Sequence, residues 1–285
     1  MTLKPYQTCV ELETSELFIR DNFKRCLEKH KYCSKRTKSI LPRRVIDLSS
    51  STYIRLIEPQ GLEAQYATLS HCWGQGQPLQ TTKSTHADML CSIPGDSLPI
   101  VFKQAILVAR GLGISYIWID SLCIIQDSRE DWELESAKMC DYYSNSYLNI
   151  SVGSSPSHDV PFLTKRDPSW YPIKFTLEDG FNKIYDIYAK RVPSPARIDD
   201  GGSLYSRAWA WQEAAMAAQT VHFMAGDLVW QCQEGIFPEH FTPSYRGLFS
   251  IGLLDHITSK QCRFVMPYND MAKANAVFVH SRHLA

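Results

Sequence analysis

The sequence predicts an α/β fold: a single domain with a mainly parallel central sheet flanked by helices. Apolar runs typical of strands alternate with amphipathic segments typical of helices between residues 66 and 152, which is the rhythm of a parallel α/β sheet. Residues 114–126, ISYIWIDSLCIIQ, begin with an apolar run that indicates a strand buried on both faces. The 285 residues are enough for one large core. We expect the strand at about 115–120 to lie at the centre of the sheet.

The first 60 residues predict a helix and a short β unit packed on the core. Residues 15–32 place apolar side chains at roughly helical spacing. Residues 42–57, PRRVIDLSSSTYIRLI, are typical of two short strands around a Ser-rich turn.

Cys26, His30 and Cys33 lie close together in the sequence and allow two interpretations. All three are zinc-ligand types, and Cys9 could supply a fourth. However, tight zinc sites usually use short paired spacings such as C-x2-C, and here the fourth ligand would have to come from a distance. We therefore expect a packed helix end and no tightly held metal.

The central strands and helices follow in order. Residues 66–74, YATLSHCWG, predict a strand that stops at Gly74, and the long polar loop at 75–97 is typical of a functional or mobile segment. Residues 98–112 then place apolar side chains on one helical face, and the strand at 115–120 follows at once.

A second helix should begin after Asp127 or Ser128, because a cap residue is followed there by acidic residues that favour a helix N-terminus. We expect its stripe of Trp132, Ser136, Met139 and Tyr143 to face the core. The apolar run at 147–152, YLNISV, predicts another buried strand.

Residues 153–204 interrupt this rhythm and predict a β-rich insertion or lid, with a hairpin at 173–190. A helix at 207–218 and two strands at 220–223 and 227–232 should complete the domain. The expected organisation is a lead-in at 1–60, the main domain at 61–240 and a C-terminal extension at 241–285.

Composition excludes several classes of protein. Thirty basic and thirty acidic residues give a net charge of zero, which argues against non-specific electrostatic binding of nucleic acid. No apolar run reaches the 18 or so residues of a membrane span. Nine cysteines cannot all pair within the chain, so we expect a reducing, cytoplasmic compartment and no structural disulfide. No G-x4-G-K-[ST] phosphate loop is present, and we expect no bound cofactor.

Three separated blocks resemble one family. They are YATLSHCWG at 66–74, the long block at 98–151 that contains W-I-D-S-L-C-I-x-Q-D, and SRAWAWQEAAMAAQTVHF followed by LVWQCQE at 206–234. The chain resembles the fungal heterokaryon-incompatibility (HET) domain over most of residues 26–235. It departs from the family in the third block, where AAMAAQ at 214–219 replaces a Leu-Ser-Arg-like segment.

The resemblance implies a fungal, cytoplasmic protein of self/non-self recognition that acts as an effector of programmed cell death. It also implies a distant TIR-like or flavodoxin-like fold. Self-association, or another incompatibility protein, would be its partner. Two alternatives stay open, a stand-alone enzyme of a secondary-metabolite pathway and a TIR-like hydrolase of a nucleotide cofactor.

Polar residues inside the three blocks are the candidate site. The carboxyl ends of neighbouring parallel strands converge, so Asp120 and His71 should face one crevice that Glu213 closes. Two neighbouring carboxylates raise one pKa, as general acid–base catalysis requires. Cys123 with His71 could instead form a thiolate nucleophile. The candidate binding residues are Ser70, Trp73, Gly74, Gln126, Arg207 and Gln212.

A structural interpretation of the same residues also stays open. Asp120 could bond the backbone of its turn, and Cys123 could be a packed thiol. Arg207 could form buried ion pairs with Asp120 and Glu213, because buried charges are tolerated only when they are paired. Signalling would then depend on assembly and not on catalysis.

Overall fold

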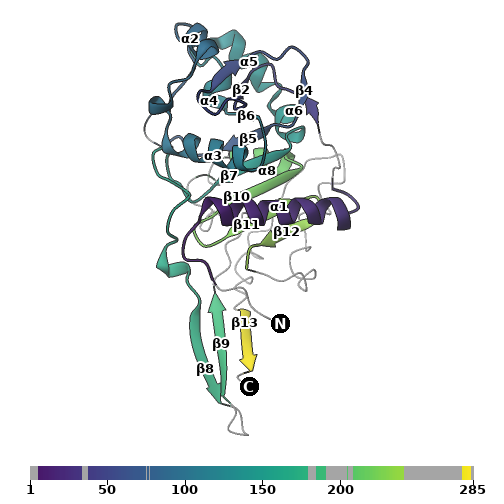
Figure 1. Ribbon diagram of the computed structural model, residues 1–285, viewed down its shortest axis with the longest axis vertical. Helices are drawn as coiled ribbons and strands as arrows, with labels where there is room; N and C mark the ends of the chain where they lie inside the picture. Colours follow the sequence, from purple (N-terminus) through teal and green to yellow (C-terminus); the bar gives the residue numbers. More distant parts are fainter. Residues whose placement is uncertain are drawn as a thin grey trace.

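An eight-stranded mixed sheet lies at the centre of the computed structural model (Figure 1). The structure describes residues 6–33, 38–74, 76, 78–178, 184–190, 204, 208–240 and 278–283. Across the sheet the strands are β12 (Gly235–Pro238), β11 (Leu228–Cys232), β10 (Gln219–Phe223), β7 (Leu148–Val152), β5 (Ala67–Ser70), β6 (Tyr116–Trp118), β2 (Val45–Asp47) and β3 (Arg55–Ile57).

The four middle strands, β10, β7, β5 and β6, pair in parallel, as the strand–helix rhythm predicts. The outer strands pair antiparallel on both sides. Short turns join β10 to β11 and β11 to β12, and a short turn can connect only antiparallel strands. The α/β class with a helix-flanked sheet is thus confirmed, whereas "mainly parallel" is too strong for a mixed sheet. The strand predicted at 115–120 is interior, but β5 and β7 occupy the middle.

The order of the parallel strands fixes where a ligand site should lie. The chain passes from β5 to its neighbour β6, then returns across β5 to β7 and continues to β10. In open α/β sheets, ligands bind beyond the carboxyl ends of the parallel strands, at the point where the strand order reverses. Here that point lies between the ends of β5 and β7.

The helices cover both faces of the sheet. Aromatic contacts place Phe23 of the first helix against Trp230 of β11, with ring centroids 4.9 Å apart. The neighbouring Val229 packs instead with Ala210 of the last described helix, and adjacent strand residues point to opposite faces. The helices are α1 (Leu12–Lys29), α2 (His86–Cys91), α3 (Ile100–Gly111), α4 (Asp120–Cys123), α5 (Arg129–Ser136), α6 (Met139–Ser144) and α8 (Ala208–Met216).

On one face α1 packs against α3 and β11; on the other, α8 packs against α6 and β5. Short 3-10 turns occur at η1 (Gly95–Ser97) and η2 (Pro168–Trp170). In the described part of the chain, no helix combines the length and the hydropathy needed to cross a bilayer.

Two small sheets accompany the central one. Strands β1 (Ser39–Ile40) and β4 (Glu63–Ala64) pair antiparallel. The hairpin predicted at 173–190 is present as β8 (Ile173–Glu178) and β9 (Ile184–Lys190), and β13 (Phe278–His283) adds to β9. This three-stranded sheet extends away from the central sheet at the bottom of Figure 1.

Helix α5 turns a different face to the core from the one predicted. It begins after Ser128 as expected, but Trp132 is 51% exposed. The buried residues of the helix are Asp131 and Glu135, and the helix ends before Met139. The prediction of an apolar stripe through Trp132 is therefore wrong, because the buried partners of α5 are charged and the helix turns its carboxylates inward.

Those partners are two arginines that precede β2. Arg44, only 1% exposed, pairs with Asp131, and its Nε donates to the carbonyl of Cys123 at 2.7 Å. Arg43 lies 3.0 Å from Asp131 and 3.5 Å from Glu135. Asp131 also accepts from the backbone N–H of Ile125 at 2.8 Å. Although burial opposes ionisation, these donors hold the pKa of Asp131 below its ordinary value.

The cysteines described by the structure are all reduced: Cys9, Cys26, Cys33, Cys72, Cys91, Cys123, Cys140 and Cys232. Cys262 lies outside the described residues. The structure thus agrees with the expectation of no disulfide for the cysteines that it describes.

The Arg44–Asp131 pair predicts a sharp stability difference between two acids of α5. Asp131→Asn leaves the Arg44 charge buried without its counter-ion and should lower the free energy of unfolding by about 3–5 kcal/mol. Glu133→Gln is the matched control, since its pair with Arg129 is 56% and 90% exposed and should contribute less than about 1 kcal/mol. Urea unfolding measures both, and equal losses would contradict this role for Arg44.

Candidate functional site

The hydroxyl of Tyr143, on α6, is the meeting point of residues from all three sequence blocks. Ser70 ends β5 and Glu213 lies on α8, and the side chains of both interact with the Tyr143 hydroxyl. Asp120, which begins α4 directly after β6, contributes its charge to the same hydroxyl. The structure therefore brings Asp120, Glu213 and Ser70 together around Tyr143, at the carboxyl edge of the parallel strands.

The electrostatic state of Tyr143 follows from this environment. Burial raises the pKa of its hydroxyl well above the ordinary value, and the negative charges of Glu213 and Asp120 add to the effect. The side chain is therefore a neutral phenol at physiological pH. Its hydroxyl also lies 3.4 Å from the carbonyl oxygen of Leu69. A neutral donor between two carboxylates can orient a polar ligand or share a proton with it.

A buried polar surface leads from this edge underneath α8. In the parallel register Thr68 of β5 stands beside Asn149 of β7, and Asn149 stands beside Thr220 of β10. The next row on the same face consists of Ser70, Ser151 and His222. Each of the six side chains is at most 1% exposed. Strands buried on both faces are normally almost continuously apolar, so this polar surface is unusual.

Asn149 is the centre of its hydrogen bonds. Its Oδ1 accepts from Thr68 Oγ1 at 3.1 Å and from Ser70 Oγ at 3.2 Å. Its Nδ2 and the Oγ1 of Thr220 have no hydrogen-bond partner among the residues that the structure describes. Buried polar atoms of this kind cost stability unless they are satisfied, which is consistent with a functional site.

The predicted residues at the end of β5 separate from this cluster. His71 is 5% exposed and packs edge-on against Phe102 of α3, with centroids 4.9 Å apart. Trp73 accepts through its carbonyl from His158. Gly74 has φ +73°, and a Cβ there would meet the Cβ of Ser157 at 2.5 Å, so glycine permits the close approach of this loop.

Cys123 and Gln126 have structural surroundings. Cys123 is fully buried, and burial raises the pKa of its thiol to about 12, so the thiol stays protonated and does not suit a thiolate nucleophile. The packed-thiol alternative describes it better. Gln126 donates through Nε2 to the carbonyls of Asp120 and Ile124 at 3.0 and 3.1 Å. These two bonds stabilise the turn that carries Asp120.

Two predicted residues cannot be placed in the cluster. Arg207 lies outside the described residues, so the predicted ion pairs with Asp120 and Glu213 stay a prediction. Gln212 belongs to α8, but its side chain also lies outside the described part.

Sequence reasoning missed Tyr143 and Asn149 as site residues. The sequence pattern predicts Tyr143 as part of a core stripe and Asn149 as part of an apolar strand. A signal was available in the short strings TLS, NIS and TVH of β5, β7 and β10. Each alternates polar with apolar side chains, and in parallel strands with this register such alternation puts every polar group on one face.

The prediction of no metal depended on an argument that the structure overturns. Cys9 does not join Cys26, His30 and Cys33, but Cys232 of β11 does. The ligand atoms of the four residues lie within 4.8 Å of one another, and all four residues are buried. Sequence spacing concealed the fourth ligand because Cys232 lies 202 residues after His30 in the chain.

A second group of metal-ligand types, Asp227, Glu239 and His240, is occupied by protein partners. His240 Nδ1 lies 2.6 Å from Asp227, and Arg166 lies 2.6 Å from Glu239. The charges of these acids are therefore paired within the fold.

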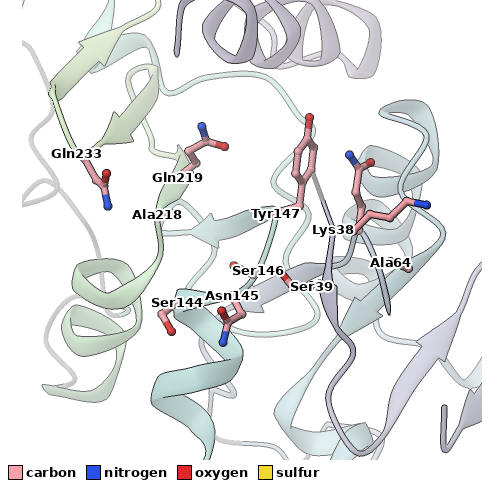
Figure 2. A pocket seen from close by; sticks show the side chains of 11 residues that line it. Lys38, Ser39, Ala64, Ser144, Asn145, Ser146, Tyr147, Ala218, Gln219 and Gln233 are labelled. Atoms are coloured by element: carbon pink, nitrogen blue, oxygen red, sulfur yellow. The ribbon is translucent and has the colours of Figure 1, made fainter. Parts of the chain in front are cut away.

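A polar cavity of about 260 Å³ lies at the opposite, amino edge of the parallel strands. Figure 2 shows Tyr147 and Gln219, which immediately precede or begin β7 and β10, with Lys38 to one side. Among the described residues that line this cavity, Lys38 is the one charged side chain and none is a carboxylate. Because ligands of α/β sheets bind at the carboxyl edge, the Tyr143 cluster is the better candidate.

The family model of the heterokaryon incompatibility protein (HET) matches residues 66–213, just over half of the chain. The chain belongs to the HET family. No curated protein and no solved structure matches it, so the kinship with TIR domains stays an expectation.

The limits of the HET match show which of the two clusters belongs to the family domain. It begins just before β5, ends at Glu213, and contains Ser70, Asp120, Tyr143 and Asn149. The cluster around Tyr143 thus lies entirely inside the HET match. The four metal-ligand residues lie outside it.

The polar surface predicts a specific acid sensitivity. Burial lowers the pKa of His222 from 6.5 to about 4, so the unfolded chain binds a proton below pH 6.5 that the folded chain does not. Stability should fall by up to about 3 kcal/mol as pH falls from 6.5 to 4. When the free energy of unfolding is plotted against pH across this range, the slope should be shallower for His222→Gln than for the wild type. His86→Gln on α2 is the control, and an equal change in slope there would contradict the assignment to His222.

Proposed function

We propose that this protein is a cell-death effector of fungal self/non-self recognition that acts in the cytoplasm. Membership of the HET family supports an incompatibility-type function. The observation that carries the finer proposal is the convergence of Asp120, Glu213 and Ser70 on the Tyr143 hydroxyl. Three segments far apart in sequence contribute one side chain each to a single place at the carboxyl edge, where α/β sheets bind their ligands.

The arrangement favours a site that acts on a small polar molecule. Carboxylates from α4 and α8 flank a phenol that burial keeps neutral, and neighbouring polar atoms of Asn149 and Thr220 lie beneath α8. Paired acidic groups with a shared donor are a common basis of general acid–base catalysis. This favours the second candidate, cleavage of a nucleotide cofactor, as the way in which the effector would kill.

Glu213→Gln tests the proposal because Gln keeps the size of the side chain and can still accept from Tyr143. Expressed from an inducible promoter in a fungal host, the wild-type protein should cause death. Glu213→Gln and Asp120→Asn should abolish it, with melting temperatures close to that of the wild type. Glu133→Gln, exposed on α5, is the control that should remain lethal.

Viability and intracellular NAD should be read together. Death accompanied by loss of NAD supports the hydrolase, whereas death without loss of NAD, unaffected by Glu213→Gln, would contradict an active site and favour signalling by assembly with itself or with another incompatibility protein. A wild-type chain that causes no death would contradict the effector role and favour the biosynthetic alternative.

A further inference from the structure

Four buried metal-ligand side chains converge at the end of helix α1. Cys26 lies on α1, His30 is the cap residue at its C-terminus, and Cys33 follows within three residues. Cys232 reaches the same point from the end of β11. Their exposed fractions are between 1% and 6%, so solvent is excluded from all four.

The distances fit one tetrahedral ion. His30 Nδ1 lies 3.2 Å from Cys33 Sγ and 3.5 Å from Cys232 Sγ, and all four ligand atoms lie within 4.8 Å of one another. Zinc bonds of about 2.3 Å to sulfur and about 2.0 Å to nitrogen give tetrahedron edges of about 3.8 Å between sulfurs and about 3.5 Å between sulfur and nitrogen. Small adjustments of the side chains therefore suffice to place an ion among them.

The surroundings are those of a metal-binding turn. The backbone N–H groups of Glu234 and Gly235 donate toward the Cys232 sulfur, as backbone donors do for thiolates that bind a metal. Phe237 stacks on the His30 ring with centroids 5.5 Å apart, which fixes the ring plane. Thiols that serve only as small hydrophobes have no reason to direct three sulfurs and a ring nitrogen at one point.

We propose that Cys26, His30, Cys33 and Cys232 bind one structural Zn²⁺ ion. Three sulfurs and one imidazole nitrogen in a tetrahedral arrangement are a ligand set that zinc prefers. Four protein ligands leave no open position for substrate, so the ion is structural and not catalytic. It joins the C-terminal end of α1 to the turn between β11 and β12. This site is separate from the Tyr143 cluster and does not depend on the proposed function.

Elemental analysis of the full-length chain, purified under reducing conditions without chelator, should find about one zinc per chain. Cys232→Ser and Cys26→Ser should each lose most of it. Cys91→Ser is the matched control, because this cysteine is exposed on α2, and it should keep the full zinc content. His240→Gln should keep it also, which separates this site from the Asp227–Glu239–His240 group.

A second measurement does not require variants that fold. Wild-type protein loaded with Co²⁺ in place of zinc should show the intense visible bands of tetrahedral, thiolate-bound cobalt, and a strong chelator should lower its melting temperature. Zinc content unchanged in both Cys26→Ser and Cys232→Ser would overturn the proposal. So would a wild-type protein that contains no zinc and develops no such bands when the metal is offered.

Discussion

The ion pair between Arg44 and Asp131 is the interaction on which the rest of the central region depends. Arg44 comes from the segment before β2, and Asp131 from the first turn of α5. Between them they bind the carbonyl of Cys123, the last residue of α4, and the amide of Ile125, which lies just after the helix. These hydrogen bonds connect the buried charge pair to the backbone on both sides of Ile124, so the turn that starts at Asp120 is held in one position.

This constraint gives a physical meaning to the most characteristic string of the sequence. W-I-D-S-L-C-I-x-Q-D reads as one motif, yet its residues have different tasks. Trp118 packs in the core beside Tyr142 and Tyr143, and Gln126 donates to two carbonyls of the turn. Asp120 accepts from the backbone N–H of Ser121 at 2.7 Å, and its charge acts on the Tyr143 hydroxyl. Most residues of the string therefore hold the turn in place, and the Asp120 carboxylate is the one that acts on the candidate site.

Local patterns predicted most of the elements, whereas long-range partners were beyond them. Helix α3 and strand β7 follow from periodicity, since apolar spacing alone decides which face is buried. The orientation of α5 does not, because the arginines that attract its carboxylates lie about 90 residues earlier. Cys232 was missed for the same reason. Tyr143 was read as core, and it is buried, but its hydroxyl gives it a second role that periodicity does not report.

The contact between α1 and β11 has a consequence for the order of folding. Phe23 packs on Trp230, so the earliest helix of the chain completes its surroundings only with one of the last strands of the sheet. A ribosome releases α1 long before β11 exists, and contacts so distant in sequence form slowly. Helix α1 can meet α3 once residue 111 has been made, but the part of its apolar face that contacts β11 stays uncovered until about residue 230 has been synthesised.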